Sequence, residues 1–210
     1  MSRPAALGLS TYALKPRFQS LLRPLVRRLA RCGVRANHVT VVAATLSIVV
    51  GSIAAWAVPD TRAFLLIPLW LLVRMALNAI DGMLAREFGQ ESRLGFYLNE
   101  LGDVASDLAL YLPFAWVSSF SAALVVMAVV LAVVSEYAAV LRVAAGEPRR
   151  NDGPMGKSDR AFAFGALGLW VGVGSPAAAL GDVAMALIVI ALGITVLNRV
   201  RGALMRQPVR

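Results

Sequence analysis

Long apolar runs separated by short polar segments dominate the chain from residue 38 onward. A membrane-spanning helix needs about 20 mostly apolar residues to cross roughly 30 Å of hydrocarbon. Six runs approach this length, and the fifth is the shortest and is rich in glycine. They cover residues 38–58, 62–86, 94–117, 121–141, 160–174 and 176–197. The pattern predicts an all-α, polytopic membrane protein with six transmembrane helices.

A different pattern precedes the first run, between residues 10 and 36. Apolar and basic residues interleave there at a spacing that gives a helix one apolar stripe and one basic face. The residues concerned are Leu21, Leu22, Leu25, Val26 and Leu29 on the stripe and Arg23, Arg27, Arg28 and Arg31 on the face. We expect an amphipathic interfacial helix on the cytoplasmic leaflet, with a solvated basic leader as the alternative. The chain then divides into a juxtamembrane segment (1–37), a membrane domain (38–200) and a basic tail (201–210).

Composition supports the membrane class and explains the charge. Of the 210 residues, 59% are hydrophobic and only 16% are charged, and the mean hydropathy is +0.70, which excludes an ordinary soluble domain. The net charge is +9, yet all but Arg62 and Arg74 of the 21 Lys and Arg residues fall in the N-terminal segment, after the second and fourth runs, or in the tail. Short cytoplasmic loops accumulate Lys and Arg. Both termini are therefore expected in the cytoplasm, and no nucleic acid is needed to explain the charge.

The chain has a single cysteine, Cys32, and a single histidine, His38. This excludes an intramolecular disulfide framework and any metal site built from several cysteines or histidines. A metal ion in this protein must be bound by oxygen.

Acidic residues inside the apolar runs are the candidates for chemistry. An acid at a helix centre costs at least about 2.5–3.5 kcal/mol on insertion scales, so such residues are usually functional and paired. They are Asp81, Glu100, Asp103, Asp107, Glu136 and Asp182. Glu136 is equally well explained as a structural partner of Arg74 or Arg142, and Asp182 as an interfacial residue.

Several of these polar residues share helix faces. Asn99, Asp103 and Asp107 recur every fourth residue, which places them on nearly one face, and Asn78 and Asp81 form a similar stripe on the preceding run. Both stripes open toward the predicted cytoplasmic half. We expect an acidic cavity there that suits a hard divalent cation, Mg²⁺ or Mn²⁺, and a phosphorylated substrate.

Residues 78–103 read NAIDGMLAREFGQESRLGFYLNELGD. This stretch resembles the signature of the CDP-alcohol phosphotransferase family, D-x2-D-G-x2-A-R-x8-G-x3-D-x3-D. The positions in register are Asp81, Gly82, Ala85, Arg86, Gly95 and Asp103. The sequence Ala-Asn-His-Val-Thr at residues 36–40 is similar to the family's P-N-x-x-T at the start of its first span.

The resemblance implies a metal-dependent enzyme of phospholipid synthesis. An alcohol would attack the phosphorus of a CDP-linked donor such as CDP-diacylglycerol, and CMP would leave. The implied residues for the CDP moiety are Asn37, Thr40, Gly82, Ala85, Arg86 and Gly95. The implied metal ligands are Asn78, Asp81, Asn99 and Asp103, and Asp103 matches the family's general base. Lys157 and Arg160 lie where family members with phosphorylated acceptors hold basic residues, although the positive-inside rule explains them equally well.

Two motif positions depart from the family. Asn78 and Asn99 stand where the signature has aspartate, so each keeps one oxygen donor but loses a charge. Glu100 and Asp107 are further carboxylates near the motif, but Glu100 lies about 100° around the helix from Asn99 and Asp107 lies one turn deeper than Asp103. Three outcomes stay open: two metal ions with weaker ligands, a single ion, or a non-catalytic member.

Two other classes of function compete with a phosphotransferase. The departures favour a non-catalytic subunit that binds lipid or nucleotide, and the buried acids alone would also suit an ion-coupled transporter, which leaves Gly82, Ala85 and Arg86 unexplained. For the enzyme, we expect a CDP-linked lipid, a polar alcohol and membrane lipids as partners, and a homodimer by resemblance. The location expected is the bacterial inner membrane, with the active site facing the cytoplasm.

Overall fold

The computed structural model describes residues 11–58, 60–146, 153–174 and 176–204. Residues 1–10 of the predicted N-terminal segment and 205–210 of the predicted tail lie outside these ranges. Within them the regular structure is entirely helical, as the sequence predicts. The elements are α1 (Thr11–Arg31), α2 (Ala36–Trp56), the 3₁₀ helix η1 (Thr61–Leu65), α3 (Leu66–Glu87), α4 (Arg93–Tyr111), the 3₁₀ helix η2 (Leu112–Trp116), α5 (Ala122–Ala144), α6 (Lys157–Val173) and α7 (Ala178–Leu204).

Four of the helical segments are long and apolar enough to cross a membrane: α2, η1 with α3 (Thr61–Glu87), α5 and α7. At 1.5 Å per residue, the 21 residues of α2 extend roughly 30 Å, the thickness of the hydrocarbon core. These segments correspond to the first, second, fourth and sixth predicted spans. The protein is thus an all-helical membrane protein.

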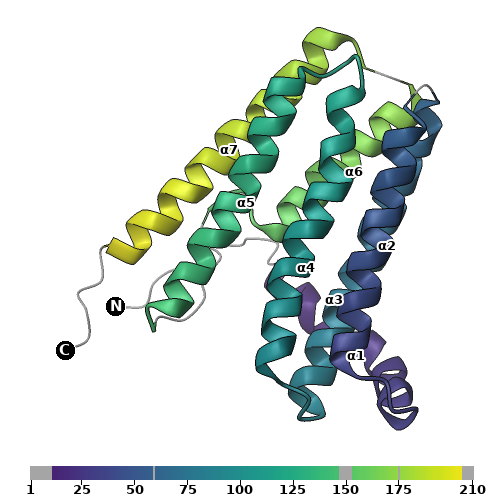
Figure 1. Ribbon diagram of the computed structural model, residues 1–210, viewed down its shortest axis with the longest axis vertical. Helices are drawn as coiled ribbons and strands as arrows, with labels where there is room; N and C mark the ends of the chain where they lie inside the picture. Colours follow the sequence, from purple (N-terminus) through teal and green to yellow (C-terminus); the bar gives the residue numbers. More distant parts are fainter. Residues whose placement is uncertain (1–10, 59, 147–152, 175, 205–210) are drawn as a thin grey trace.

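The third and fifth predicted spans are also helices, but each lacks one property of a simple membrane span. Helix α4 carries Arg93, Glu100, Asp103 and Asp107 among its 19 residues, and α6 has only 17 residues. Helix α4 packs against α2 and α6 packs against α3 (Figure 1), and each also exposes large apolar side chains, such as Leu101 on α4 and Phe162 on α6. A crossing by all six segments, and the side on which the termini lie, stay predictions.

The predicted amphipathic N-terminal helix is present as α1. Part of its apolar stripe is buried against the bundle, and part is exposed. Val26 is fully buried, and Leu22 and Leu29 pack with it against residues of α2 and α3. Leu21 and Leu25 point outward and are largely exposed. The stripe therefore both attaches α1 to the bundle and leaves an apolar edge free, which suits a helix at the membrane interface.

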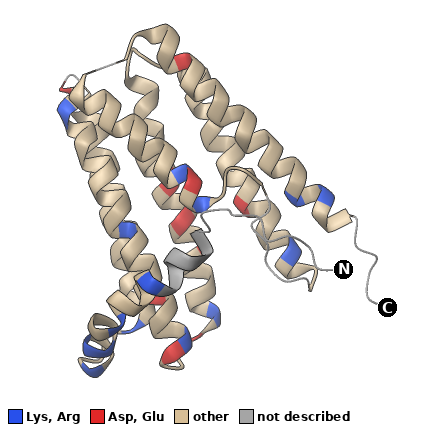
Figure 2. Cartoon of the chain, turned by 180° about the vertical axis from the view of Figure 1, so that it is seen from behind, with Lys and Arg blue, Asp and Glu red and all other residues tan. Residues whose placement is uncertain are grey.

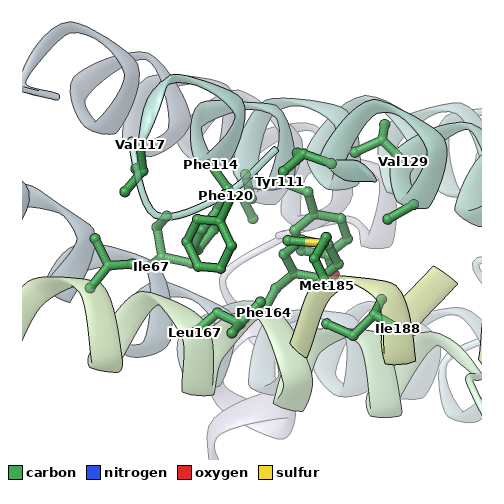
Figure 3. Packing of buried hydrophobic residues seen from close by; sticks show 14 of the residues in the cluster. Ile67, Tyr111, Phe114, Val117, Phe120, Val129, Phe164, Leu167, Met185 and Ile188 are labelled. Atoms are coloured by element: carbon green, nitrogen blue, oxygen red, sulfur yellow. The ribbon is translucent and has the colours of Figure 1, made fainter. Parts of the chain in front are cut away.

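Aromatic side chains fill the centre of the bundle. The rings of Tyr111 and Phe164 stack with centroids 3.9 Å apart, and Phe114 meets Phe64 and Phe164 edge to face at 5.0 Å and 5.6 Å. Figure 3 shows the rings of Tyr111 from α4, Phe114 from η2 and Phe164 from α6 close to Met185 and Ile188 of α7. Tyr111 lies one turn after Asp107 on α4, so this packing fixes the rotation of α4 and of the polar residues that precede it.

Glycine permits the closest contact between α2 and α4. A Cβ atom on Gly51 would lie 2.0 Å from the carbonyl oxygen of Ala109, a distance that no real Cβ tolerates. By contrast, a Cβ on Gly193 of α7 would meet no atom within 4 Å. The two glycines are both helical, but only Gly51 is required by packing.

We predict opposite effects for Gly51→Ala and Gly193→Ala. Replacing a helical glycine by alanine favours the helix by about 1 kcal/mol, whereas forcing a methyl group into a packed interface costs about 1–3 kcal/mol. Gly51→Ala should therefore lower the thermal unfolding temperature of the purified protein in detergent, and Gly193→Ala should leave it unchanged or raise it. Equal shifts for the two variants would contradict the assigned contact.

Candidate active site

The turn between α3 and α4 brings the two motif carboxylates together. Gly89 has φ +65°, a left-handed conformation that glycine adopts without strain. Ser92 then caps α4, its hydroxyl accepting a hydrogen bond from the Gly95 amide at 3.0 Å. Asp81 on α3 and Asp103 on α4 are both buried, at 6% and 9% exposure, on two consecutive helices that each pack against α2.

Asp81 is bound by a neutral donor from a third helix. The hydroxyl of Thr40 on α2 donates to Asp81 Oδ2 at 2.8 Å. Within the described part of the chain, Asp81 forms no ion pair. Thr40 and Asp81, which were predicted to have different roles, are thus in direct contact, and the carboxylate keeps its charge uncompensated by direct contact.

Asp103 has a different environment, because a cation contacts each of its oxygens. Arg74 Nη2 lies 3.1 Å from Oδ1, and the Lys157 ammonium at the start of α6 contacts Oδ2. Lys157 and Asp103 are also close enough to Asp81 to act on it electrostatically. The structure therefore places three predicted site residues, from α3, α4 and α6, in one polar cluster.

A chain of buried ion pairs continues from Asp103 into the bundle. Arg74 also contacts Asp107 Oδ1 at 2.7 Å, and Asp107 Oδ2 accepts from Arg160 Nη2 at 3.0 Å. Arg160 reaches Glu136 Oε1 at 2.9 Å, and Glu136 lies 3.5 Å from Arg199. In Figure 2 the acidic and basic segments meet in the middle of the bundle. We call this set, from Lys157 to Arg199, the ion-pair chain.

The ion-pair chain contains residues that sequence reasoning did not assign. Arg74 stands alone within an apolar span, which indicates a buried partner, and it was considered only as a partner of Glu136. In the structure Arg74 pairs with Asp103 and Asp107 on α4. Arg199 also escaped notice, because it is grouped with the basic tail in the sequence. In the structure Arg199 is 1% exposed, and its Nη1 donates to the carbonyl of Ser135 and approaches Glu136.

The residues predicted for the CDP moiety line the rim of the same region. A Cβ on Gly95 would lie 2.7 Å from Asn37 Oδ1, so α4 and α2 are in close contact there. A Cβ on Gly82 would lie 2.9 Å from Arg86 Nη2, so the Arg86 guanidinium covers Gly82. Ala85 is half-buried between them on the α3 surface.

A small cavity of about 280 Å³ adjoins this rim. Its lining is Arg35, Ala36, Asn37, Gln90, Glu91 and Ser92. The side-chain oxygen of Gln90 accepts a hydrogen bond from the Ala36 amide at 2.7 Å, which holds the α3–α4 turn against the start of α2. The cavity opens one helical turn from Thr40, so it is a suitable place for part of a nucleotide.

The remaining predicted residues take less central positions. Asn78 and Asn99 are half-buried, and the Asn99 amide makes only a long 3.5 Å contact with Glu100. Both oxygens of Asp107 are occupied by Arg74 and Arg160. Arg160 is completely buried, whereas the Lys157 side chain is 34% exposed. Among the predicted basic residues at the mouth of α6, Lys157 is therefore the one that a bound molecule can reach.

Few oxygen donors for a metal ion lie together at this site. In the described residues, no three or more carboxylate, histidine or cysteine side chains converge as a metal site. Each oxygen of Asp103 already contacts a cation. Asp81, with Asn78 one turn away on α3, offers a carboxylate and an amide oxygen, and Mg²⁺ is commonly held by one or two carboxylates plus substrate phosphates and water.

Comparison with known proteins identifies the family of this chain. A profile described as CDP-alcohol phosphatidyltransferase matches residues 34–205. Inner membrane protein YnbA of Escherichia coli (strain K12) is 42% identical over 197 residues, covering 94% of this chain and 98% of YnbA.

Two crystal structures of Mycobacterium tuberculosis phosphatidylinositol phosphate synthase (PgsA1) share the fold. The form with CDP-DAG bound has a TM-score of 0.68 at 24% identity, covering 88% of this chain and 96% of that chain. The form in complex with manganese and citrate has a TM-score of 0.72 at 22% identity, covering 87% and 88%. Since the profile spans most of the chain and includes the motif residues, the protein belongs to the CDP-alcohol phosphatidyltransferase family.

Proposed function

We propose that the protein transfers a phosphatidyl or phosphoalcohol group from a CDP-linked donor, such as CDP-diacylglycerol, to a polar alcohol and releases CMP. The observation that carries the proposal is the position of Asp81 and Asp103. These motif carboxylates lie on the consecutive helices α3 and α4, where Asp81 contacts Thr40 and Asp103 contacts Lys157. The CDP-DAG bound to the structurally similar PgsA1 supports a CDP-linked donor.

The donor would bind across the rim formed by α2, α3 and α4. Asn37 lines the small cavity and Gly95 lies beside Asn37. The small side chains of Gly82 and Ala85 would let a nucleotide approach the α3 backbone once the Arg86 guanidinium, which covers Gly82 in this structure, turns to bind it. Arg86 is exposed beside Gly82, and its guanidinium is suited to a diphosphate because it presents several donors in one plane.

Asp103 is the proposed general base. The acceptor hydroxyl gives its proton to the carboxylate as its oxygen forms the new bond to phosphorus, and the bond to the CMP oxygen breaks. Each carboxylate oxygen has two lone-pair positions, so Oδ2 can accept from Lys157 and from the hydroxyl together. Arg74 and Lys157 hold the carboxylate in one orientation while it does so.

A divalent ion, Mg²⁺ or Mn²⁺, would be held by Asp81 with oxygen support from Asn78 and Asn99. Such an ion neutralises the diphosphate and stabilises the leaving phosphate. Thr40 keeps Asp81 oriented from α2. The manganese in the complex of the similar PgsA1 supports this part of the proposal.

The acceptor would enter beside α6. Lys157 is partly exposed and faces Asp103, so it is the residue best placed to contact a polar alcohol or its phosphate. Arg160, also expected at the acceptor, is buried and would act indirectly, by holding Asp107 in place. The class of acceptor proposed is a polar alcohol, with or without a phosphate.

We further propose six membrane crossings, with both termini and the active site on the cytoplasmic side of a bacterial inner membrane, and a homodimeric assembly. The pairing of Arg23 with Glu87 at 2.8 Å places the basic helix α1 at the end of α3 that lies near the motif. Because basic residues accumulate on the cytoplasmic side of membrane proteins, they support this end of the bundle as the cytoplasmic one. YnbA, 42% identical, is an inner membrane protein.

A non-catalytic subunit that binds lipid or nucleotide is the second candidate. Asn78 and Asn99 favour it, because each removes a formal charge from a motif that would otherwise have four carboxylates. The same rim and cavity would then bind a CDP-linked lipid without turnover.

The test of catalysis is a screen for CMP release. Purified protein, CDP-diacylglycerol and Mg²⁺ or Mn²⁺ are combined with glycerol phosphate, inositol phosphate, serine and other polar alcohols. We expect metal-dependent CMP release with at least one acceptor, and Asp103→Asn should lower its rate by about 10²–10⁴, the usual contribution of a general base. Asp60→Asn, at the start of η1, is the matched control and should retain the natural rate.

Full activity of Asp103→Asn would remove the assigned base. Donor binding without CMP release from any acceptor would favour the non-catalytic subunit. Uptake of a solute into vesicles without CMP would instead favour a transporter.

A second variant tests the orientation of Asp81. Thr40→Val preserves the side-chain shape but removes the donor to Asp81 Oδ2, and a hydrogen bond to a charged group is worth about 1.5–3 kcal/mol. We expect kcat/KM for the CDP-linked donor to fall by about 10- to 100-fold, since 1.4 kcal/mol is a factor of ten. Thr45→Val, at an exposed position of the same helix, should leave kcat/KM unchanged.

A further inference from the structure

Lys157 brings an ammonium group into the motif site. Its ammonium contacts Asp103 Oδ2, and its charge also acts on Asp81. A lysine at the cytoplasmic end of a membrane helix ordinarily extends into water or toward lipid headgroups. Here the side chain is only 34% exposed and is directed to a motif carboxylate instead.

The backbone before Lys157 is fixed to α7 and to its own helix. The Met155 amide donates to Thr195 Oγ1 at 2.9 Å, and Gly153 lies so close to Thr195 that a Cβ would come within 2.7 Å of it. The Gly156 amide donates to Asp159 Oδ2 at 2.9 Å, which caps α6 at the residue before Lys157. These contacts hold the start of α6 in place, so the Lys157 ammonium reaches Asp103 from a fixed backbone.

The site has few negative charges and two cations. Asn78 and Asn99 stand at two of the four motif positions, leaving Asp81 and Asp103 as carboxylates. Lys157 and Arg74 each place a cation on Asp103. A site with two carboxylates, one of them already neutralised, attracts a second doubly charged ion only weakly, because like charges repel.

We propose that the Lys157 ammonium takes the place of one of the two divalent cations for which a four-carboxylate motif is suited. The inference rests on the proposed function for the role of this site. The protein then holds one divalent ion per chain, at Asp81, while Lys157 neutralises Asp103 and meets the substrate phosphate from the α6 side. Asn78 and Asn99 lower the negative charge of the site, and Lys157 supplies the positive charge that a second ion would otherwise bring.

The experiment counts Mn²⁺ ions bound to the purified full-length protein in detergent, by electron paramagnetic resonance, without substrate. The natural protein should bind one ion. The variant N78D/N99D restores both carboxylates but keeps Lys157, and it should also bind one ion, more tightly. Adding Lys157→Met to that variant should raise the number to two.

Two matched variants control for charge. Lys157→Arg in the N78D/N99D background keeps the cation and should stay at one ion. Arg93→Met in the same background removes one exposed positive charge from the start of α4 and should also stay at one ion. Two ions in N78D/N99D with Lys157 present, or one ion after Lys157→Met, would overturn the proposal.

A single substitution keeps the test decisive if N78D/N99D fails to fold. Lys157→Met in the otherwise natural protein should tighten Mn²⁺ binding by at least about tenfold, since a neighbouring positive charge is removed, and Arg93→Met should not. Equal affinities for these two variants would contradict the proposal. Because Mn²⁺ binding is measured without turnover, this test is independent of the proposed activity. A protein that never releases CMP can still show the predicted binding, and an active enzyme can lack it.

Discussion

The ion-pair chain is the constraint on which the rest of the structure depends. Charged side chains in an apolar bundle are costly unless each has an opposite partner, and removing one member leaves its partner buried and unpaired. Its members are Lys157, Asp103, Arg74, Asp107, Arg160, Glu136 and Arg199. Because they come from α3, α4, α5, α6 and α7, these pairs fix the relative rotation of five helices. Few other arrangements of the same helices would satisfy them.

The active-site geometry follows from this constraint. Arg74 and Lys157 orient Asp103 from two sides, and Asp107, one turn further along α4, is held by Arg74 and Arg160. The stacked rings of Tyr111 and Phe164 continue the same contact between α4 and α6 into the apolar core. A carboxylate on such a support, as the proposed general base Asp103 is, needs little reorganisation when a substrate binds. Asp81 differs, because its partner is the neutral hydroxyl of Thr40. Its negative charge is not compensated by a direct contact with a cation and is available to a metal ion.

Much of this site could be predicted from local sequence. The spacing of Asp81 and Asp103 within the motif, and the long runs around them, were sufficient to place the two acids on consecutive helices joined by a short turn. The motif singled out Asn37, Thr40 and Gly95 as well, but it did not predict the contacts of Asn37 with Gly95 and of Thr40 with Asp81 that the structure contains. The amphipathic N-terminal helix was also predictable from its periodicity.

The partners of the buried basic residues could not be predicted from the sequence. Lys157 and Arg160 had two equally good explanations there, because loop charges and site charges look alike when only composition and topology are known. Arg199 was hidden among tail residues for the same reason. Which acid each cation meets depends on the rotation of α6 and α7 about their axes, and long-range packing rather than local spacing sets that rotation.

The most direct test of the central claim is a crystal structure of the protein with CDP and Mn²⁺, with manganese located by its anomalous scattering. The account predicts the diphosphate beside Gly82 and Arg86, one manganese peak at Asp81, and the Lys157 ammonium still on Asp103. A nucleotide bound away from α3, or two manganese peaks with Lys157 displaced, would contradict it.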